Sequence, residues 1–294
     1  LSVIFPAERL QEQGYKVVKI PVNREGFVDQ GRLEEEADDD TFLVSMGAVN
    51  HEIGVIQDLE GLVEVVKDHD PSILFHTDMA DALGRIDINL EKLNVDLASF
   101  SSHKVYGPKG AGLLYVKEGI KLEPVIHGQL SSQKLWPGVE NIPSIAGFAK
   151  AAEAMEDLDK TRLIKLRDEL IEGITSQVED TILNGPGGLR RSPDNVNVSF
   201  LYVEGEALIV ELSMRGIYAS SGSACTSRIL QPSHVLLAIG RRYEEAHGSL
   251  LMKVTPFHGE EDVDYVLRHI PEGVARLRAL SPIKRERGEI SHVQ

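Results

Sequence analysis

The first half of the chain alternates short, continuous apolar runs with longer stretches of helical spacing. Residues 59–68 place apolar side chains three or four positions apart, as one buried face of a helix requires. The apolar runs predict five strands, at 17–21, 41–46, 72–78, 97–101 and 112–116. Because continuous apolar strands between helices are typical of parallel sheets covered on both faces, this half predicts an α/β domain.

The pattern changes after residue 140. Residues 145–158 and 162–178 predict two long helices, the second with Lys and Glu at helical spacing. Further strands are predicted at 196–201, 217–220 and 250–254, and further helices at 205–214, 232–238 and 260–280. The predicted fold class is therefore α/β with two domains: a large, mostly parallel sheet domain over 1–140 and a smaller α+β domain over 141–294.

Composition narrows the class of protein. The net charge of the 294 residues is −15, which argues against nucleic acid as a partner, because phosphate binding needs clustered Lys and Arg. No apolar run reaches the length of a membrane span, and no basic-then-apolar signal segment opens the chain. The single cysteine excludes an internal disulfide framework. We predict a cytoplasmic protein with no membrane partner and no metal site.

Polar residues follow three of the predicted strands, where ligands of parallel α/β sheets bind. They are the segment 47–54, His76-Thr77-Asp78, and the Ser101-Ser102-His103-Lys104 of SSHKVYGPKG. Singly, each has an ordinary structural interpretation: a lysine beside a Gly-Pro turn is usually a surface charge, and such an aspartate is usually a cap. Together they match pyridoxal 5′-phosphate (PLP), which needs a lysine, a carboxylate at its pyridine nitrogen and donors around its phosphate.

The only cysteine, Cys225, lies in the small, polar stretch SSGSACTS. Free cysteines are commonly buried and inert. A Gly- and Ser-rich loop is not a core environment, however, so an accessible and mobile thiol is the interpretation that we favour.

Several motifs in one order resemble the NifS/IscS-type cysteine desulfurases, which are fold-type I PLP enzymes of the class-V aminotransferase group. The resemblance covers nearly the whole chain, through VNHEIGVIQDL, HTDMADALGRIDI, SFSSHKVYGPKGAGLLYV, NVNVSFLYVEGEALI and SSGSACTS. It implies the PLP-dependent transferase fold. It also implies that Lys104 carries PLP, that Asp78 pairs with the pyridine nitrogen, and that Ser101 and His103 hold the phosphate.

The resemblance further implies the reaction and its partners. Cys225 would take the sulfur of L-cysteine as a persulfide, leaving alanine, and pass it to an acceptor such as an iron–sulfur scaffold protein. A homodimer with its active site near the interface is implied as well.

Some positions depart from the family pattern. Asn50 is expected to bind the cofactor, but His51 replaces a second asparagine that touches substrate or cofactor. Asp81 stands where the family has a glutamine bonded to the PLP phenolic oxygen, and a carboxylate there needs a proton or a donor. Val139 replaces a threonine that reaches the neighbouring subunit's phosphate, and Trp136 replaces an arginine.

Two further departures concern the last predicted strand and the start of the chain. Leu251 and Pro256 stand at two arginine positions, the first of which binds the substrate carboxylate in the family, with Lys253 nearby. The chain starts just after the family's PLP-stacking histidine, so the family's N-terminal quarter is expected to be missing.

These departures leave two alternatives to an active desulfurase. One is a PLP-binding but impaired relative that acts as a scaffold or on another amino acid. The other has no cofactor, and Lys104 is then a salt-bridge residue.

Overall fold

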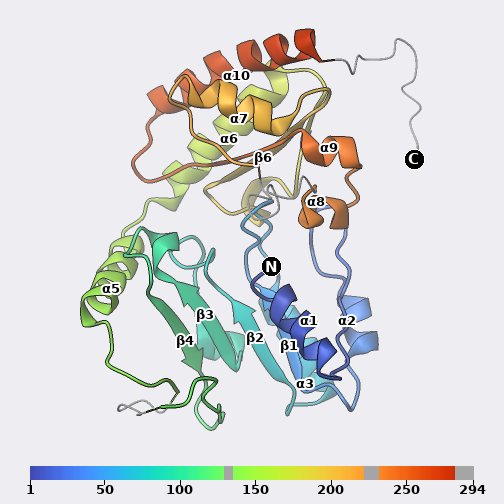
Figure 1. The fold of residues 1–294 in the computed structure, drawn as a ribbon, viewed down its shortest axis with the longest axis vertical. Coiled ribbons are helices and arrows are strands. Elements are labelled where there is room, and N and C mark those ends of the chain that lie inside the picture. Colours follow the sequence, from blue (N-terminus) through green and yellow to red (C-terminus); the bar gives the residue numbers. More distant parts are fainter. Residues whose placement is uncertain (129–134, 222–231, 282–294) are drawn as a thin grey trace. The chain divides into compact units, whose positions relative to one another are not determined.

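A computed structural model describes residues 1–128, 135–221 and 232–281 (Figure 1). The chain forms two compact units. Unit 1 comprises residues 1–21, 28–50 and 56–158, and unit 2 comprises 22–27, 51–55 and 159–294. The helix predicted at 145–158 therefore belongs with the first sheet, although the sequence had placed it in the second domain.

Unit 1 is built on a four-stranded sheet with the order β1-β2-β3-β4. Strands β1 (Leu43–Gly47), β2 (Leu74–Asp78) and β3 (Leu97–Ser101) are parallel, and β4 (Gly112–Val116) runs antiparallel to β3. In the sheet register Gly47 pairs with Asp78, which in turn pairs with Ser99. The sheet thus aligns the carboxyl ends of β1, β2 and β3 at one edge.

Helix α3 (Leu59–His69) covers one face of this sheet. Asp58 caps the helix by accepting a hydrogen bond from the Gly61 N–H, and Leu62, Val63 and Val66 are buried in one cluster with Phe75 of β2. The opposite face of β2 is only half-buried in the described residues. The other helices of this unit are α1 (Ile4–Glu12), α2 (Gln30–Glu36), α4 (Leu90–Leu93) and α5 (Ile142–Glu156).

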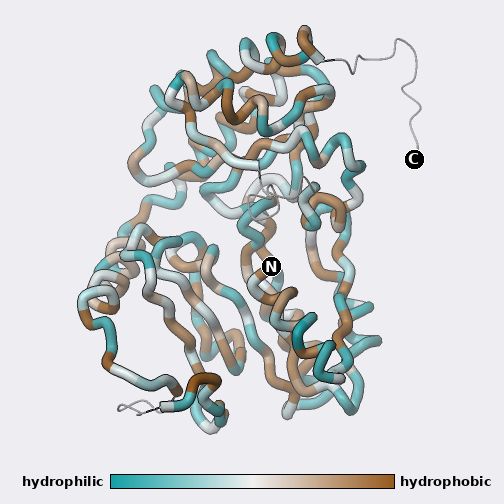
Figure 2. Tube along the Cα trace, viewed as in Figure 1, coloured by the Kyte–Doolittle hydropathy of each residue, from teal (hydrophilic) through white to brown (hydrophobic). Residues whose placement is uncertain are grey.

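Unit 2 is an antiparallel sheet covered by helices. Its strands are β5 (Thr181–Leu183), β6 (Asn195–Phe200) and β7 (Ser249–Lys253), with β6 in the centre and fully buried. Its helices are α6 (Lys160–Gln177), α7 (Gly205–Ser213), α8 (His234–Ala238), α9 (Tyr243–His247) and α10 (Glu260–Leu280). Figure 2 shows hydrophobic and hydrophilic residues mixed along α10, and Val263, Ile270 and Val274 on it are buried.

Two predicted strands are wrong. Residues 17–21 form no strand; Pro21 ends the segment without a backbone donor, and a turn at 23–26 follows. In 217–220 only Ser220 pairs, through two backbone hydrogen bonds with Leu251 of β7. An apolar run resembles a strand in sequence, but it becomes one only where a neighbouring strand offers a continuous row of partners.

Candidate active site

Lys104 lies at the carboxyl end of β3, in the 3₁₀ turn η1 (Ser102–Val105). Its Nζ lies 2.9 Å from Oδ2 of Asp81, which follows β2. The Lys104 side chain is 32% exposed and that of Asp81 only 9%. Arg85 Nη2 donates to the backbone oxygen of Lys104 at 3.0 Å, which fixes the turn that bears the lysine. In this ion pair the lysine amine is therefore accessible to solvent, whereas the carboxylate is mostly buried.

The shape of this turn depends on residues beyond the lysine. Tyr106 ends the turn with a positive φ of 64°, and Gly107 follows. A Cβ on Gly107 would lie 2.3 Å from the Ser102 Oγ, so this position has no room for a side chain. Val105 is buried against Phe148 of α5. The Lys-Val-Tyr-Gly sequence therefore anchors the turn on its apolar side and leaves the lysine on the polar side.

Asp78 lies at the end of β2, the strand next to β3, and is half-buried. Its Oδ1 accepts a hydrogen bond from the Ala80 N–H at 2.9 Å, which orients the carboxylate at the strand end. Ser101 ends β3, and its Oγ lies 3.0 Å from the His103 Nδ1. The structure thus places the predicted carboxylate, hydroxyl, imidazole and lysine on the ends of two adjacent strands, while Asn50 lies in the loop after β1.

His76 lies in one of the polar strand ends that the sequence analysis noted, but the sequence analysis assigned it no role of its own. Its Nδ1 lies 2.8 Å from Ser45 Oγ, and its Nε2 lies 3.2 Å from Ser99 Oγ, so it links three strands. Burial lowers the pKa of His76, and the charge of nearby Asp78 opposes that shift. Since alternate strand residues share a face, the His-x-Asp spacing was the signal that could have revealed it.

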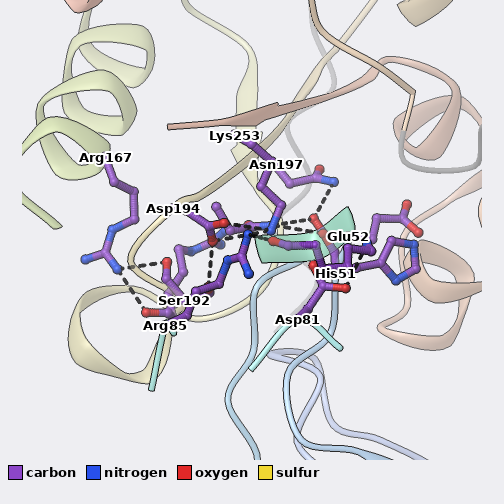
Figure 3. Close-up of polar contacts among 12 residues, drawn as sticks. His51, Glu52, Asp81, Arg85, Arg167, Ser192, Asp194, Asn197 and Lys253 are labelled. Carbon is purple, nitrogen blue, oxygen red and sulfur yellow. Dashed lines mark hydrogen bonds and ion pairs between the residues drawn. The ribbon is translucent and has the colours of Figure 1, made fainter. Parts of the chain in front are cut away.

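Unit 2 holds the segment that follows Asn50. Asn195 and Asn197 of β6 both donate to the backbone oxygen of Glu52, at 3.1 and 3.0 Å, and Asn195 also donates to that of His51 (Figure 3). Burial raises the pKa of the Glu52 carboxyl to about 7, opposed by a hydrogen bond from Ser233. Two buried amides therefore fix the backbone of residues 51 and 52, and one of them, Asn195, contacts His51 itself.

The candidate clamp for a substrate carboxylate is also in unit 2. Leu251 is buried, and Lys253 forms an ion pair with the buried Asp194, with Nζ–Oδ1 at 3.3 Å (Figure 3). The backbone oxygen of Pro256 accepts a hydrogen bond from Arg162 at 3.2 Å. Lys253 is thus committed to an acid of its own unit.

Three further positions were singled out from the sequence, and two of them lie in the described part of the chain. Trp136 and Val139 are exposed side chains of unit 1. Cys225 lies outside the described residues.

The comparisons with known sequences all point to the same class of protein. The sequence profile of the class-V aminotransferases matches residues 1–266. A protein of Archaeoglobus fulgidus named cysteine desulfurase IscS 1 is 44% identical over 288 residues, covering 97% of this chain and 74% of that protein. The mitochondrial cysteine desulfurase of Saccharomyces cerevisiae is 42% identical, covering 96% of this chain and 56% of that protein.

Solved structures give the same result for the fold. A NifS-like protein superimposes with a TM-score of 0.85 at 36% identity, over 94% of this chain and 72% of the other. A structure described as SspA in complex with cysteine has a TM-score of 0.74 at 30% identity, over 87% of this chain and 71% of the other.

The sheet topology and these neighbours define an α/β enzyme of PLP fold type I, as the resemblance implied. The chain belongs to the class-V aminotransferase family, among the IscS- and NifS-type cysteine desulfurases. Enzymes of this group depend on PLP. The side chains at the strand ends fit that cofactor in type, since they supply a part-exposed amine, a carboxylate on the adjacent strand and two phosphate donors.

No helix in the described ranges is both long and apolar enough to cross a membrane.

Proposed function

We propose that this chain is a PLP-dependent cysteine desulfurase that takes sulfur from L-cysteine. The identity to desulfurases over nearly the whole chain supports the reaction, as does the cysteine bound to the SspA relative. The observation that carries the site is the part-exposed Lys104 amine at the carboxyl end of β3, next to the strand that ends in Asp78. Parallel α/β enzymes bind their ligands at this edge.

The proposed roles at this edge follow from chemistry. Lys104 would bind the cofactor covalently, and the Asp78 carboxylate would keep its pyridine nitrogen protonated. Ser101 and His103 would donate to its phosphate, and Asn50 and Asp81 would contact its ring substituents. When bound, PLP supplies an electrophilic aldehyde and an electron sink.

Cys225 is the proposed sulfur carrier. Its thiolate would attack the sulfur of the substrate cysteine, so that an S–S bond forms as the substrate C–S bond breaks. The carbon skeleton then leaves as alanine after protonation, and the persulfide passes its outer sulfur to an acceptor. We further propose a homodimer, a cytoplasmic location and a sulfur-acceptor protein such as an iron–sulfur scaffold.

The decisive experiment combines trapping with turnover. The purified chain is mixed with PLP and reduced with borohydride, and the modified peptide is mapped by mass spectrometry. We expect a pyridoxyl group on Lys104. In an aliquot that was not treated with borohydride, we expect alanine release from cysteine, a persulfide on Cys225, and sulfide release once an added thiol reductant cleaves the persulfide. Cys225→Ser should keep the Lys104 adduct and lose sulfide release. Scattered labelling of surface lysines, without sulfide, would reject the proposal for this chain.

One alternative has a specific observation in its favour. Leu251 is buried and Lys253 is paired with Asp194, at positions where the resemblance expects an arginine clamp for the substrate carboxylate. A PLP protein without that clamp would act poorly on cysteine or serve as a scaffold. A Lys104 adduct without desulfuration would favour this alternative, whereas restoring turnover with Leu251→Arg would locate the defect.

A further inference from the structure

We propose that Asp81 is the proton partner of Lys104: its carboxylate holds the lysine as an ammonium and thereby limits how readily the amine reacts with an aldehyde. This inference deepens the proposed function, on which it rests for the identity of the aldehyde. The ion pair between Asp81 and Lys104 is formed by the chain's own residues and does not depend on a cofactor.

The geometry favours a persistent pair. The two charged groups are 2.9 Å apart, which is a charge-assisted contact. The Asp81 side chain is 9% exposed, so water compensates little of its charge, and the ammonium is its near counter-charge. Lys104 is instead 32% exposed, so its Nζ remains open to reagents from solvent.

Other charged groups around the lysine have partners or face elsewhere. His103 on the same turn contacts the Ser101 hydroxyl, and Arg85 donates to the Lys104 backbone oxygen. Asp78, at the end of β2, accepts from the Ala80 N–H. Helix α5 packs on this turn through Phe148, Ala151 and Met155. Its charged Lys150 and Glu153 pair with each other in solvent.

The chemical consequence has a definite direction. A lysine forms a bond to a carbonyl carbon only after its ammonium has lost a proton, because the protonated nitrogen has no lone pair. A carboxylate at 2.9 Å stabilises the ammonium over the neutral amine. Asp81 can accept that proton and return it, but while it is ionised it favours the unreactive form. Removing its charge should therefore increase the reactivity of Lys104.

The test measures this reactivity in the apo chain, without PLP. Traces of acetic anhydride label each lysine in proportion to its neutral amine, and mass spectrometry quantifies the Lys104 peptide between pH 6 and 9. Asp81→Asn keeps the side-chain size and removes the charge. Glu153→Gln is the matched control, because it removes one negative charge from an exposed lysine pair.

We expect Asp81→Asn to label Lys104 about 3- to 10-fold faster at pH 7. Glu153→Gln should leave Lys104 labelling unchanged. The part-buried Lys67 is an internal reporter of unfolding, since its side chain is only 12% exposed and all three ammonium donors have acceptors, so it should be labelled slowly in a folded variant. If Asp81→Asn exposes Lys67, Asp81→Gln and milder temperature replace it.

Labelling of Lys104 that is unchanged or slower in folded Asp81→Asn would overturn the inference. Borohydride trapping with PLP on the same variants separates the two proposals. Faster anhydride labelling without any PLP adduct would support Asp81 as the proton partner and reject the cofactor role of Lys104. A PLP adduct that forms at the wild-type rate, with unchanged anhydride labelling, would do the reverse.

Discussion

Two lysine–aspartate pairs lie at opposite ends of the same sheet and differ in how they are enclosed. Lys67, in the last turn of α3, pairs with Asp96, which directly precedes β3; their side chains are 12% and 5% exposed, and Nζ–Oδ2 is 2.6 Å. Lys104 and Asp81 are at the carboxyl ends of β3 and β2, with the lysine 32% exposed. The same two residue types thus form a closed pair at one end and an open pair at the other.

The surroundings of the closed pair explain the difference. Lys67 Nζ also donates to the backbone oxygens of Ile73 and Pro71, at 2.7 and 3.3 Å, and Asp96 accepts from the Phe75 N–H at 2.7 Å. All donors of the Lys67 ammonium therefore have acceptors. In the open pair the Lys104 ammonium contacts the Asp81 carboxylate, and the amine is accessible to solvent. A lysine whose hydrogen bonds are complete contributes to stability, whereas one held by a single acid is suited to chemistry.

The largest expected effect is the loss of cofactor capture. Lys104→Ala should abolish the borohydride-trapped PLP adduct at this site, because no amine remains there. Lys67→Met, measured at a temperature where it is folded, should retain the adduct. Peptide mapping after trapping checks both, and capture that follows Lys67 instead would reverse the assignment of the two pairs.

The next effect is on stability, where replacing Lys67 should cost more than replacing Lys104, the reverse of their effects on PLP capture. Lys67→Met leaves the buried Asp96 carboxylate without its nearer cation, with Lys117 Nζ 3.9 Å away, and should lower the free energy of unfolding by about 3–5 kcal/mol. Lys104→Met should cost less, about 1–2 kcal/mol, because Lys104 is part-exposed, so that water can take the place of its ammonium and solvate the Asp81 carboxylate. Urea unfolding of the two variants measures the difference, and equal costs would contradict it.

The third prediction concerns Glu52, a buried acid of unit 2, which extends the comparison of buried charges to the pH dependence of stability. Burial raises the pKa of Glu52 from its ordinary 4.5 to about 7 in the folded protein, so the folded state binds more protons between these values. Stability from this group is therefore present below about pH 4.5 and is lost as pH rises through 7. Glu52→Gln should stabilise the protein at pH 8 by on the order of 3 kcal/mol and change little at pH 5.

Urea midpoints at the two pH values test this prediction. A stabilisation of Glu52→Gln that is equal at both would show that packing, not titration, is responsible.

The smallest effect is on the helix that carries the closed lysine. Asp58→Ala removes the side-chain acceptor for the Gly61 N–H at the start of α3 and should cost about 1 kcal/mol. Capture of PLP at Lys104 should not change, since α3 contributes no residue to that edge. Thermal unfolding and trapping on one preparation check both; altered capture would show that the two ends of the sheet are coupled.

The sequence predicted the parts of this site that lie on strands. The apolar runs ending in Asp78 and Ser101 located two strand ends, and parallel topology then required them to be adjacent. It did not predict that Asp81 contacts Lys104, because the two lie 23 positions apart in the chain and only the turn after β2 brings them together. The contacts of His76 were not predicted for a related reason, because its serine partners lie on the two neighbouring strands.

The two units exchange segments of the chain, and this limits how the protein can be cut into separate fragments. Residues 22–27 and 51–55 belong to unit 2, although the chain on both sides of each segment belongs to unit 1. A protease nick near residue 158 would therefore leave unit 2 without two of its own segments, and the fragments should stay associated. For the same reason, neither unit can be transplanted as an uninterrupted cassette into another gene.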